Sequence, residues 1–136
     1  MSGKILLDTN LWIYLISGRC NKSAVVKELI ENNFSKIVFT TQIAGEIFNV
    51  LVKKKFKSIE EAKEIVTVLL TTFLASDVDV YKTLTAIEIS QKYRYSYWDS
   101  LVLASALIEE CHIVYSEDMQ NNQKIERKVK IVNPFI

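Results

Sequence analysis

Residues 4–18 read KILLDTNLWIYLISG, and this stretch indicates the class of fold. Residues 4–8 form a short apolar run that is best explained as a buried strand. Thr9 or Asn10 can then cap a helix of apolar and aromatic residues, and Gly18 stands in the usual position just past a helix end. The stretch therefore predicts a buried strand that leads directly into a helix.

The rest of the chain repeats this alternation of strands and helices. Apolar runs and alternating patterns predict four further strands, at residues 36–40, 77–81, 112–116 and 129–132. Apolar residues at helical spacing predict helices at residues 22–32, 41–55, 58–70, 83–93 and 96–110. Because the connections are long enough for crossovers, we expect a mainly parallel five-stranded sheet in a three-layer α/β/α fold.

The composition is that of an ordinary globular domain, which we expect to span residues 1–136. Apolar residues make up 49% and charged residues 24% of the chain, which excludes a disordered or fibrous protein. The net charge of +1 predicts no global basic field, so any contact with nucleic acid needs a local patch. Cys20 and Cys111 lie far apart, and no apolar run has the length of a signal peptide or a membrane span. We therefore expect a soluble, cytoplasmic protein with no membrane contact.

Two aspartates occupy positions where α/β proteins bind ligands. Asp8 comes at the end of the first predicted strand, and Asp118 follows the fourth. Ligands of open α/β sheets bind beyond the carboxyl ends of the strands, so these carboxylates converge if the two strands are neighbours. Each residue taken alone could equally be a helix cap or a turn residue.

Asp99 and Glu46 each have a structural and a functional interpretation. Ser96 and Asp99 are spaced as in a capping box, and the helix that follows is almost entirely apolar. A carboxylate at the start of a buried helix can be both a cap and a ligand. Glu46 lies in the second turn of its helix at the edge of the apolar face, where a solvated boundary residue is also common.

A shared position for these carboxylates would require a cation or shared protons. Like charges about 4 Å apart repel by about 4 kcal/mol per pair at an effective dielectric constant of 20. A site made only of oxygen ligands, without His or Cys, selects Mg²⁺ or Mn²⁺ rather than Zn²⁺. Such an ion can lower the pKa of a bound water, and one or two ions can clamp a phosphodiester.

These motifs resemble the PIN-domain ribonucleases, and most of all the VapC-type toxins of toxin–antitoxin pairs. The resemblance spans nearly the whole chain in the right order and spacing. It rests on Asp8-Thr9-Asn10 after the first strand, the helical Glu46, Tyr97-Trp98-Asp99 at the start of an apolar helix, and Ser116-Glu117-Asp118 after the fourth strand. One departure from the pattern is Gly45, which costs roughly 1 kcal/mol in a helix relative to alanine.

The resemblance implies a function and a set of site residues. Asp8, Glu46, Asp99 and Asp118 would bind Mg²⁺ or Mn²⁺ in an endoribonuclease that acts on RNA. Asn10 and Ser116 would be supporting polar residues, and Glu117 a further acid outside the metal ligands. A cognate antitoxin protein would inhibit the enzyme. A homodimer is expected as well, since the helices of residues 22–73 carry more apolar residues than a lone domain needs.

Other classes of α/β protein lack their defining residues here. A haloacid-dehalogenase-like phosphatase needs a second aspartate at position 10, which is asparagine, and a nucleotide-binding domain needs a glycine-rich loop. A phospho-acceptor domain needs its acceptor at the end of the third strand, where Asp77 and Asp79 come too early. The remaining alternative is a PIN-like scaffold that binds RNA or protein without cutting.

Basic residues are concentrated in one short run, residues 53–57. These lysines could complement the dipole of a helix C-terminus or contact RNA phosphates. Arg127, Lys128 and Lys130 allow the same two interpretations.

Overall fold

The computed structural model, which describes residues 3–136, places the first strand inside a six-stranded sheet. The strands are β1 Ile5–Leu7, β2 Ile37–Thr40, β3 Leu74–Ser76, β4 Ile113–Tyr115, β5 Lys124–Ile125 and β6 Val129–Val132. Their order is β3-β2-β1-β4-β6-β5, and every pair is parallel except β5 and β6. The prediction of a mainly parallel sheet is confirmed, with six strands in place of five.

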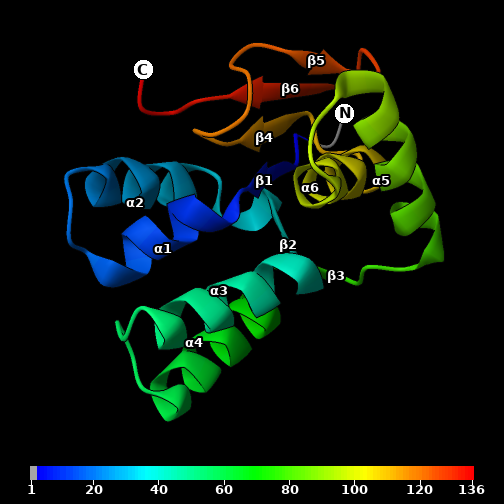
Figure 1. The fold of residues 1–136 in the computed structure, drawn as a ribbon. Helices are drawn as coiled ribbons and strands as arrows, with labels where there is room; N and C mark the ends of the chain where they lie inside the picture. The colour runs from blue at the N-terminus through cyan, green and yellow to red at the C-terminus, as the bar shows by residue number, and fades with distance from the viewer. Residues whose placement is uncertain (1–2) are drawn as a thin grey trace.

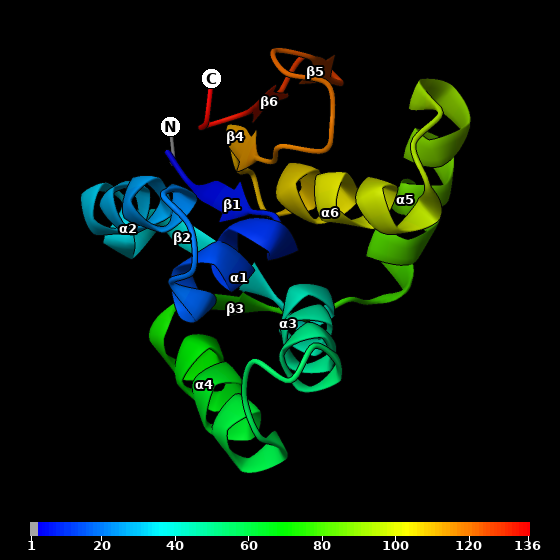
Figure 2. The same ribbon diagram turned by 60° about the vertical axis from the view of Figure 1, so that its left-hand side comes forward.

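The helices cover the sheet in pairs. They are α1 Thr9–Ser17, α2 Lys22–Asn32, α3 Thr41–Lys53, α4 Ile59–Thr72, α5 Val80–Tyr93 and α6 Tyr97–Ile108, with a 3₁₀ turn at Phe34–Lys36. Figures 1 and 2 show the α1–α2 pair and the α5–α6 pair on opposite sides of β1. The α3–α4 pair lies at the β2–β3 end, far from the β5–β6 edge (Figure 1). This is the three-layer arrangement that the sequence predicts.

The strand order creates a ligand site between β1 and β4. From β1 the chain builds outward to β2 and β3, and then adds β4 and β6 on the other side of β1. The expectation that the first and fourth predicted strands are parallel neighbours is therefore confirmed. In open α/β sheets the crevice at such a reversal is where ligands bind. Residues that follow β1 and β4 consequently lie at the natural site of this fold.

The sequence-based prediction is wrong for one strand and misses two others. Residues 77–81, predicted as a strand, leave the sheet after β3 and lead into α5. Asp79 is the N-cap of α5, its Oδ1 accepting a hydrogen bond from the Lys82 N–H at 2.9 Å. Val80 and Tyr81 are exposed, so the alternating pattern of this segment does not mark a buried face. The missed strands are short: β3 has three residues and lies just before the predicted segment, and β5 has two.

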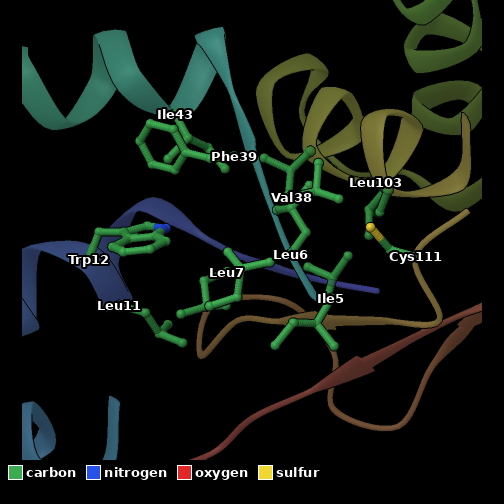
Figure 3. Packing of buried hydrophobic residues seen from close by; sticks show 14 of the residues in the cluster. Ile5, Leu6, Leu7, Leu11, Trp12, Val38, Phe39, Ile43, Leu103 and Cys111 are labelled. Carbon is green, nitrogen blue, oxygen red and sulfur yellow. The ribbon is translucent and has the colours of Figure 1, made fainter. Parts of the chain in front are cut away.

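Packing of the hydrophobic core fixes the ends of the strands that the site residues follow. Trp12 of α1 meets Phe39 of β2 edge to face, with ring centroids 5.3 Å apart. Figure 3 shows these two side chains gathered with Ile43 of α3, while Leu103 of α6 belongs to another part of the same cluster. Burial of aromatic and branched side chains is the main stabilising term here. It fixes α1, α3 and α6 relative to the sheet.

The apolar run in α6 is explained by burial of this helix within the fold. The residues from position 100 to 106 are all buried within the fold. Among the described residues, no helix is both long enough and apolar enough to cross a membrane.

Candidate active site

Asp8 stands at the end of β1 and is the N-cap of α1. Its Oδ1 accepts a hydrogen bond from the Thr9 N–H at 2.8 Å, and its Oδ2 accepts one from the Ser116 hydroxyl at 3.0 Å. The residue is only 9% exposed. The cap of α1, predicted at Thr9 or Asn10, is therefore Asp8. This residue is also a buried acid in the crevice between β1 and β4, where the strand order reverses.

Asp118 follows β4 and is held by two polar residues. Asn10 Nδ2 donates to Asp118 Oδ2 at 2.8 Å. The Ser116 hydroxyl oxygen accepts from the Asp118 N–H at 3.3 Å, while its proton goes to Asp8. Ser116 is fully buried, so it links the two strand ends rigidly. The structure thus gives Asn10 and Ser116 the supporting contacts that the resemblance implies.

Glu46 reaches the same region from the second turn of α3. Its Oε1 accepts a hydrogen bond from the Thr9 hydroxyl at 2.6 Å, and its Oε2 accepts one from Gln42 Nε2 at 3.4 Å. Thr9 therefore positions two acids at once, through its backbone N–H and its hydroxyl. The sequence analysis considered Thr9 only as a helix cap and missed this contact.

Asp99 lies in the first turn of α6. The Ser96 hydroxyl caps this helix by accepting the Asp99 N–H at 3.1 Å, as the spacing predicts. Within the described residues the reciprocal bond from the Asp99 carboxylate to the Ser96 N–H does not form. The carboxylate is therefore not used as a cap.

One cavity of about 340 Å³ brings the predicted acids together. It is lined by Asp8, Glu46, Asp99 and Asp118, with Thr9, Asn10 and Asn49 among them. Asn49 was missed in the sequence, although it lies one helical turn after Glu46 and so on the same face of α3. The four acids come from positions far apart in the chain, and the fold alone joins them.

The negative charge of this cavity has no basic partner. Burial raises the pKa of Asp8 to about 6, although hydrogen bonds from Thr9 and Ser116 oppose the change, and the charges of Asp99 and Glu46 raise it further. The pKa of Asp99 is also raised, first by burial and then by Asp118 and Glu46. No Lys, Arg or His is among the described residues that line the cavity, and the ion pairs Lys22–Glu117, Lys82–Glu109 and Lys92–Glu126 do not involve its acids. The cavity therefore favours a cation or protons.

The donor set fits a hard divalent cation. Carboxylate oxygens supplemented by amide and hydroxyl oxygens are the ligands that Mg²⁺ and Mn²⁺ take in proteins. In residues 3–136 no three acidic, His or Cys side chains already stand close enough to hold one ion. A cation in the cavity would thus draw the carboxylates together by side-chain rotation, and its charge would offset their mutual repulsion.

Glu117 lies outside this cavity. Its carboxylate accepts hydrogen bonds from the Tyr14 hydroxyl and from Lys22 Nζ, the latter at 2.6 Å. These partners belong to α1 and α2, and Glu117 is not among the residues that line the cavity. A supporting role for Glu117 outside the metal ligands stays a prediction.

A conservative substitution at each position distinguishes the role of Glu117 from that of Asp118. We expect Glu117→Gln to leave any activity of the acidic cavity within about twofold of wild type, since the amide still accepts from Tyr14 and the lost ion pair is a partly exposed one. The same change at Asp118, Asp118→Asn, should lower that activity strongly. Parallel rate measurements on the two variants test this, and equal losses would return Glu117 to the site.

Comparison with known proteins agrees with this geometry. The sequence profile of the PIN domain matches residues 5–125, which is most of the chain. The chain therefore belongs to the PIN domain family, and divalent-metal dependence is general among nucleases of this family. Among curated protein sequences, none matches this chain.

Solved structures share the fold at low sequence identity. VapC20 of Mycobacterium tuberculosis, a toxin described as cleaving the sarcin-ricin loop, is 18% identical over 85% of this chain and 90% of that chain, with a TM-score of 0.71. A toxin–antitoxin complex from Klebsiella pneumoniae is 19% identical, covering 96% and 98% of the two chains, with a TM-score of 0.74. DNA-bound VapBC from Salmonella typhimurium is 19% identical, covering 94% and 96%, with a TM-score of 0.70.

Proposed function

We propose that this protein is a metal-dependent endoribonuclease that cleaves RNA phosphodiester bonds as the toxin of a toxin–antitoxin pair in the cytoplasm. The observation that carries the proposal is the cavity between the ends of β1 and β4, which is lined by four carboxylates and, within residues 3–136, by no basic side chain. Cys20 and Cys111 are both free, which is in keeping with a reducing compartment.

In this proposal the acids Asp8, Glu46, Asp99 and Asp118 hold Mg²⁺ or Mn²⁺. When bound, such an ion lowers the pKa of a water and neutralises charge on the phosphate that is attacked. The remaining polar residues keep the acids in place. Ser116 and the Thr9 N–H fix Asp8, Asn10 fixes Asp118, and the Thr9 hydroxyl fixes Glu46.

Two protein partners follow from the same proposal. An antitoxin is supported by the fold neighbours from Klebsiella pneumoniae and Salmonella typhimurium, whose structures are toxin–antitoxin assemblies. A homodimer is supported by apolar side chains left in solvent. They include Ile59 and Val68 in the region that the sequence analysis singled out, and Val80, Leu84 and Ile87 on α5.

The decisive experiment is a cleavage assay on structured RNAs. A sarcin–ricin loop oligonucleotide belongs in the panel because a fold neighbour is described as cleaving that loop. We expect cleavage with Mn²⁺ or Mg²⁺, none in chelator, and a defined cut position when the fragment ends are sequenced. RNA binding without cleavage in either metal would contradict the proposal and favour the alternative, a PIN-like scaffold that binds RNA or protein without cutting.

A further inference from the structure

A second hollow adjoins the acidic cavity. It is a groove of about 500 Å³ between α3 and α6, lined by Gln42, Gly45, Glu46 and Asn49 of α3 and by Trp98 and Leu101 of α6. We refer to it as the α3–α6 groove. Glu46 and Asn49 line both this groove and the acidic cavity, so the two hollows share a wall. A molecule that extends from one of them enters the other.

Trp98 gives the groove an exposed aromatic wall. Its side chain is 61% exposed, whereas Trp12 is 1% exposed. Gln42 Nε2 donates to the Trp98 backbone carbonyl at 3.1 Å, and the Tyr97 ring meets the indole edge to face, with ring centroids 4.9 Å apart. An exposed indole is a surface on which a nucleobase can stack.

Gln42 contributes an unused hydrogen-bond acceptor. Its Nε2 faces two oxygens, the Trp98 carbonyl and Glu46 Oε2, so the orientation of the amide is set by these contacts. The other amide atom, Oε1, is buried and has no hydrogen-bond partner among the described residues. A buried acceptor without a donor is costly, and a small movement of the side chain that uncovers Oε1 would let an N–H group on the edge of a base supply that donor.

Gly45 keeps the floor of the groove open. A Cβ atom built at this position meets nothing within 4 Å, so no neighbouring backbone requires the glycine. Glycine within a helix costs roughly 1 kcal/mol relative to alanine, and nothing in the packing around Gly45 compensates for that cost. The open space above Gly45, on the face that lines the groove, is the one thing that a larger side chain would remove.

We propose that the α3–α6 groove is the binding subsite for one nucleobase of the RNA, next to the phosphodiester that is cut. Trp98 stacks on the base, Gln42 Oε1 accepts a hydrogen bond from its edge once a small movement of the side chain uncovers this atom, and the absent side chain at Gly45 leaves room for the base. The inference rests on the proposed function, because it takes the neighbouring cavity as the site of the phosphate. The shared wall and the polar acceptor favour a base over an apolar peptide side chain.

Binding can be measured without cleavage. In chelator, short homopolymeric oligoribonucleotides are titrated against the wild-type protein while tryptophan emission is recorded. The protein has two tryptophans and Trp12 is buried, so a change in emission reports on Trp98. We expect quenching by oligonucleotides that carry bases and none by an abasic oligonucleotide of equal charge.

Substitutions at Gly45 then test the groove itself. Gly45→Leu fills it and should weaken oligonucleotide binding by about tenfold or more, the value expected when one base loses its stacking partner. Gly45→Ala adds only a methyl group and should bind within about threefold of wild type. Both variants should fold at least as stably as wild type, because alanine and leucine favour helix more than glycine does. Thr71→Leu, an exposed position on α4, is the matched control and should bind normally.

The outcomes separate this inference from the proposed function. Binding that Gly45→Leu abolishes, in a protein that never cleaves RNA with Mn²⁺, supports the subsite and contradicts the nuclease. Metal-dependent cleavage with unchanged binding and rate in Gly45→Leu overturns the subsite and leaves the nuclease intact. Trp98 emission that responds to an antitoxin peptide but to no oligonucleotide also overturns the subsite.

Discussion

Asp8→Asn is expected to lower RNA cleavage by orders of magnitude while making the metal-free protein more stable. The asparagine keeps the size of the side chain and remains a good N-cap for α1, so the change removes a charge and little else. Cleavage falls because one of the four acids that hold the ion is lost. Stability rises because a buried acid surrounded by Asp99 and Glu46 is no longer charged.

The stability difference should depend on pH in a defined direction. The pKa of Asp8 is raised from 3.8 to about 6 in the folded protein, chiefly by burial. Below about pH 4 the residue is protonated whether folded or unfolded, so its charge costs nothing. As the pH rises to about 6, only the unfolded chain loses the proton, and the free energy of unfolding falls by about 3 kcal/mol. The Asp8→Asn variant has no ionisable group at this position, so its free energy of unfolding does not decrease for this reason.

Melting curves in chelator from pH 4 to 8 check the prediction. The variant and the wild type should nearly coincide at the acidic end, separate as the pH rises from about 4 to about 6, and keep a constant difference above that. Added Mn²⁺ should raise the melting temperature of the wild type more than that of the variant, because a ligand stabilises only the state that binds it. Equal curves, an equal response to metal and full activity together would leave Asp8 with no role beyond the cap.

Lys82→Met is expected to lower the free energy of unfolding by about 2 to 3 kcal/mol without touching the acidic cavity. Lys82 is 3% exposed, and its Nζ donates to the Ser76 hydroxyl, to the Asp77 carbonyl at 2.6 Å and to Glu109 Oε2 at 2.8 Å. These contacts tie the end of β3 and the start of α5 to the end of α6. Methionine fills the space but removes the Lys82 donor from all three oxygens, of which Glu109 Oε2 keeps the hydrogen bond from the Ser76 hydroxyl.

The effect should shrink in acid. The hydrogen bond from Lys82 is the main reason that the pKa of Glu109 is lowered. A lowered pKa of an acid stabilises the fold above its ordinary value and ceases to do so as the pH falls through the lowered one. Denaturant titrations at neutral and acid pH measure the difference. Lys92→Met, which removes the exposed pair with Glu126, should change stability by less than about 1 kcal/mol.

The sequence was sufficient to locate Asp8 and Asp118 because their position follows from a rule about strand ends. A buried apolar run fixes where a strand stops, and parallel neighbours bring their carboxyl ends to one edge. The parallel pairing of β1 with β4 satisfies that rule. Asp99 was found for a similar reason, since a cap residue marks the first turn of its helix.

Features that depend on the direction of a side chain could not be predicted in this way. The contact between Thr9 and Glu46 joins residues 37 positions apart, and it exists because the core fixes the angle between α1 and α3. Glu117 turns away from Asp118 because Tyr14 and Lys22 hold it there. Neither partner can be identified before the helices are placed.

The alternating residues 77–81 were misleading for a different reason. Aspartate and valine alternate in a strand, but the same letters also suit a short connection that ends in an N-cap. Tertiary structure decides whether residues 77–81 form a strand or a connection, since β3 pairs with β2 through Leu74, Ala75 and Ser76 and ends there. Only the placement of the strand within the sheet distinguishes the two cases.

The position of β1 between β2 and β4 has a consequence for the protein while it is being synthesised. β1 leaves the ribosome before β4, so one of its two edges stays open until Ile113, Val114 and Tyr115 have been made. Ser116, Asn10 and Asp118 cannot complete their contacts around Asp8 before that moment. A nascent chain that ends short of Asp118 therefore lacks the assembled acidic cavity, and on the proposed function the polypeptide stays inert beside the ribosome until Asp118 has been made.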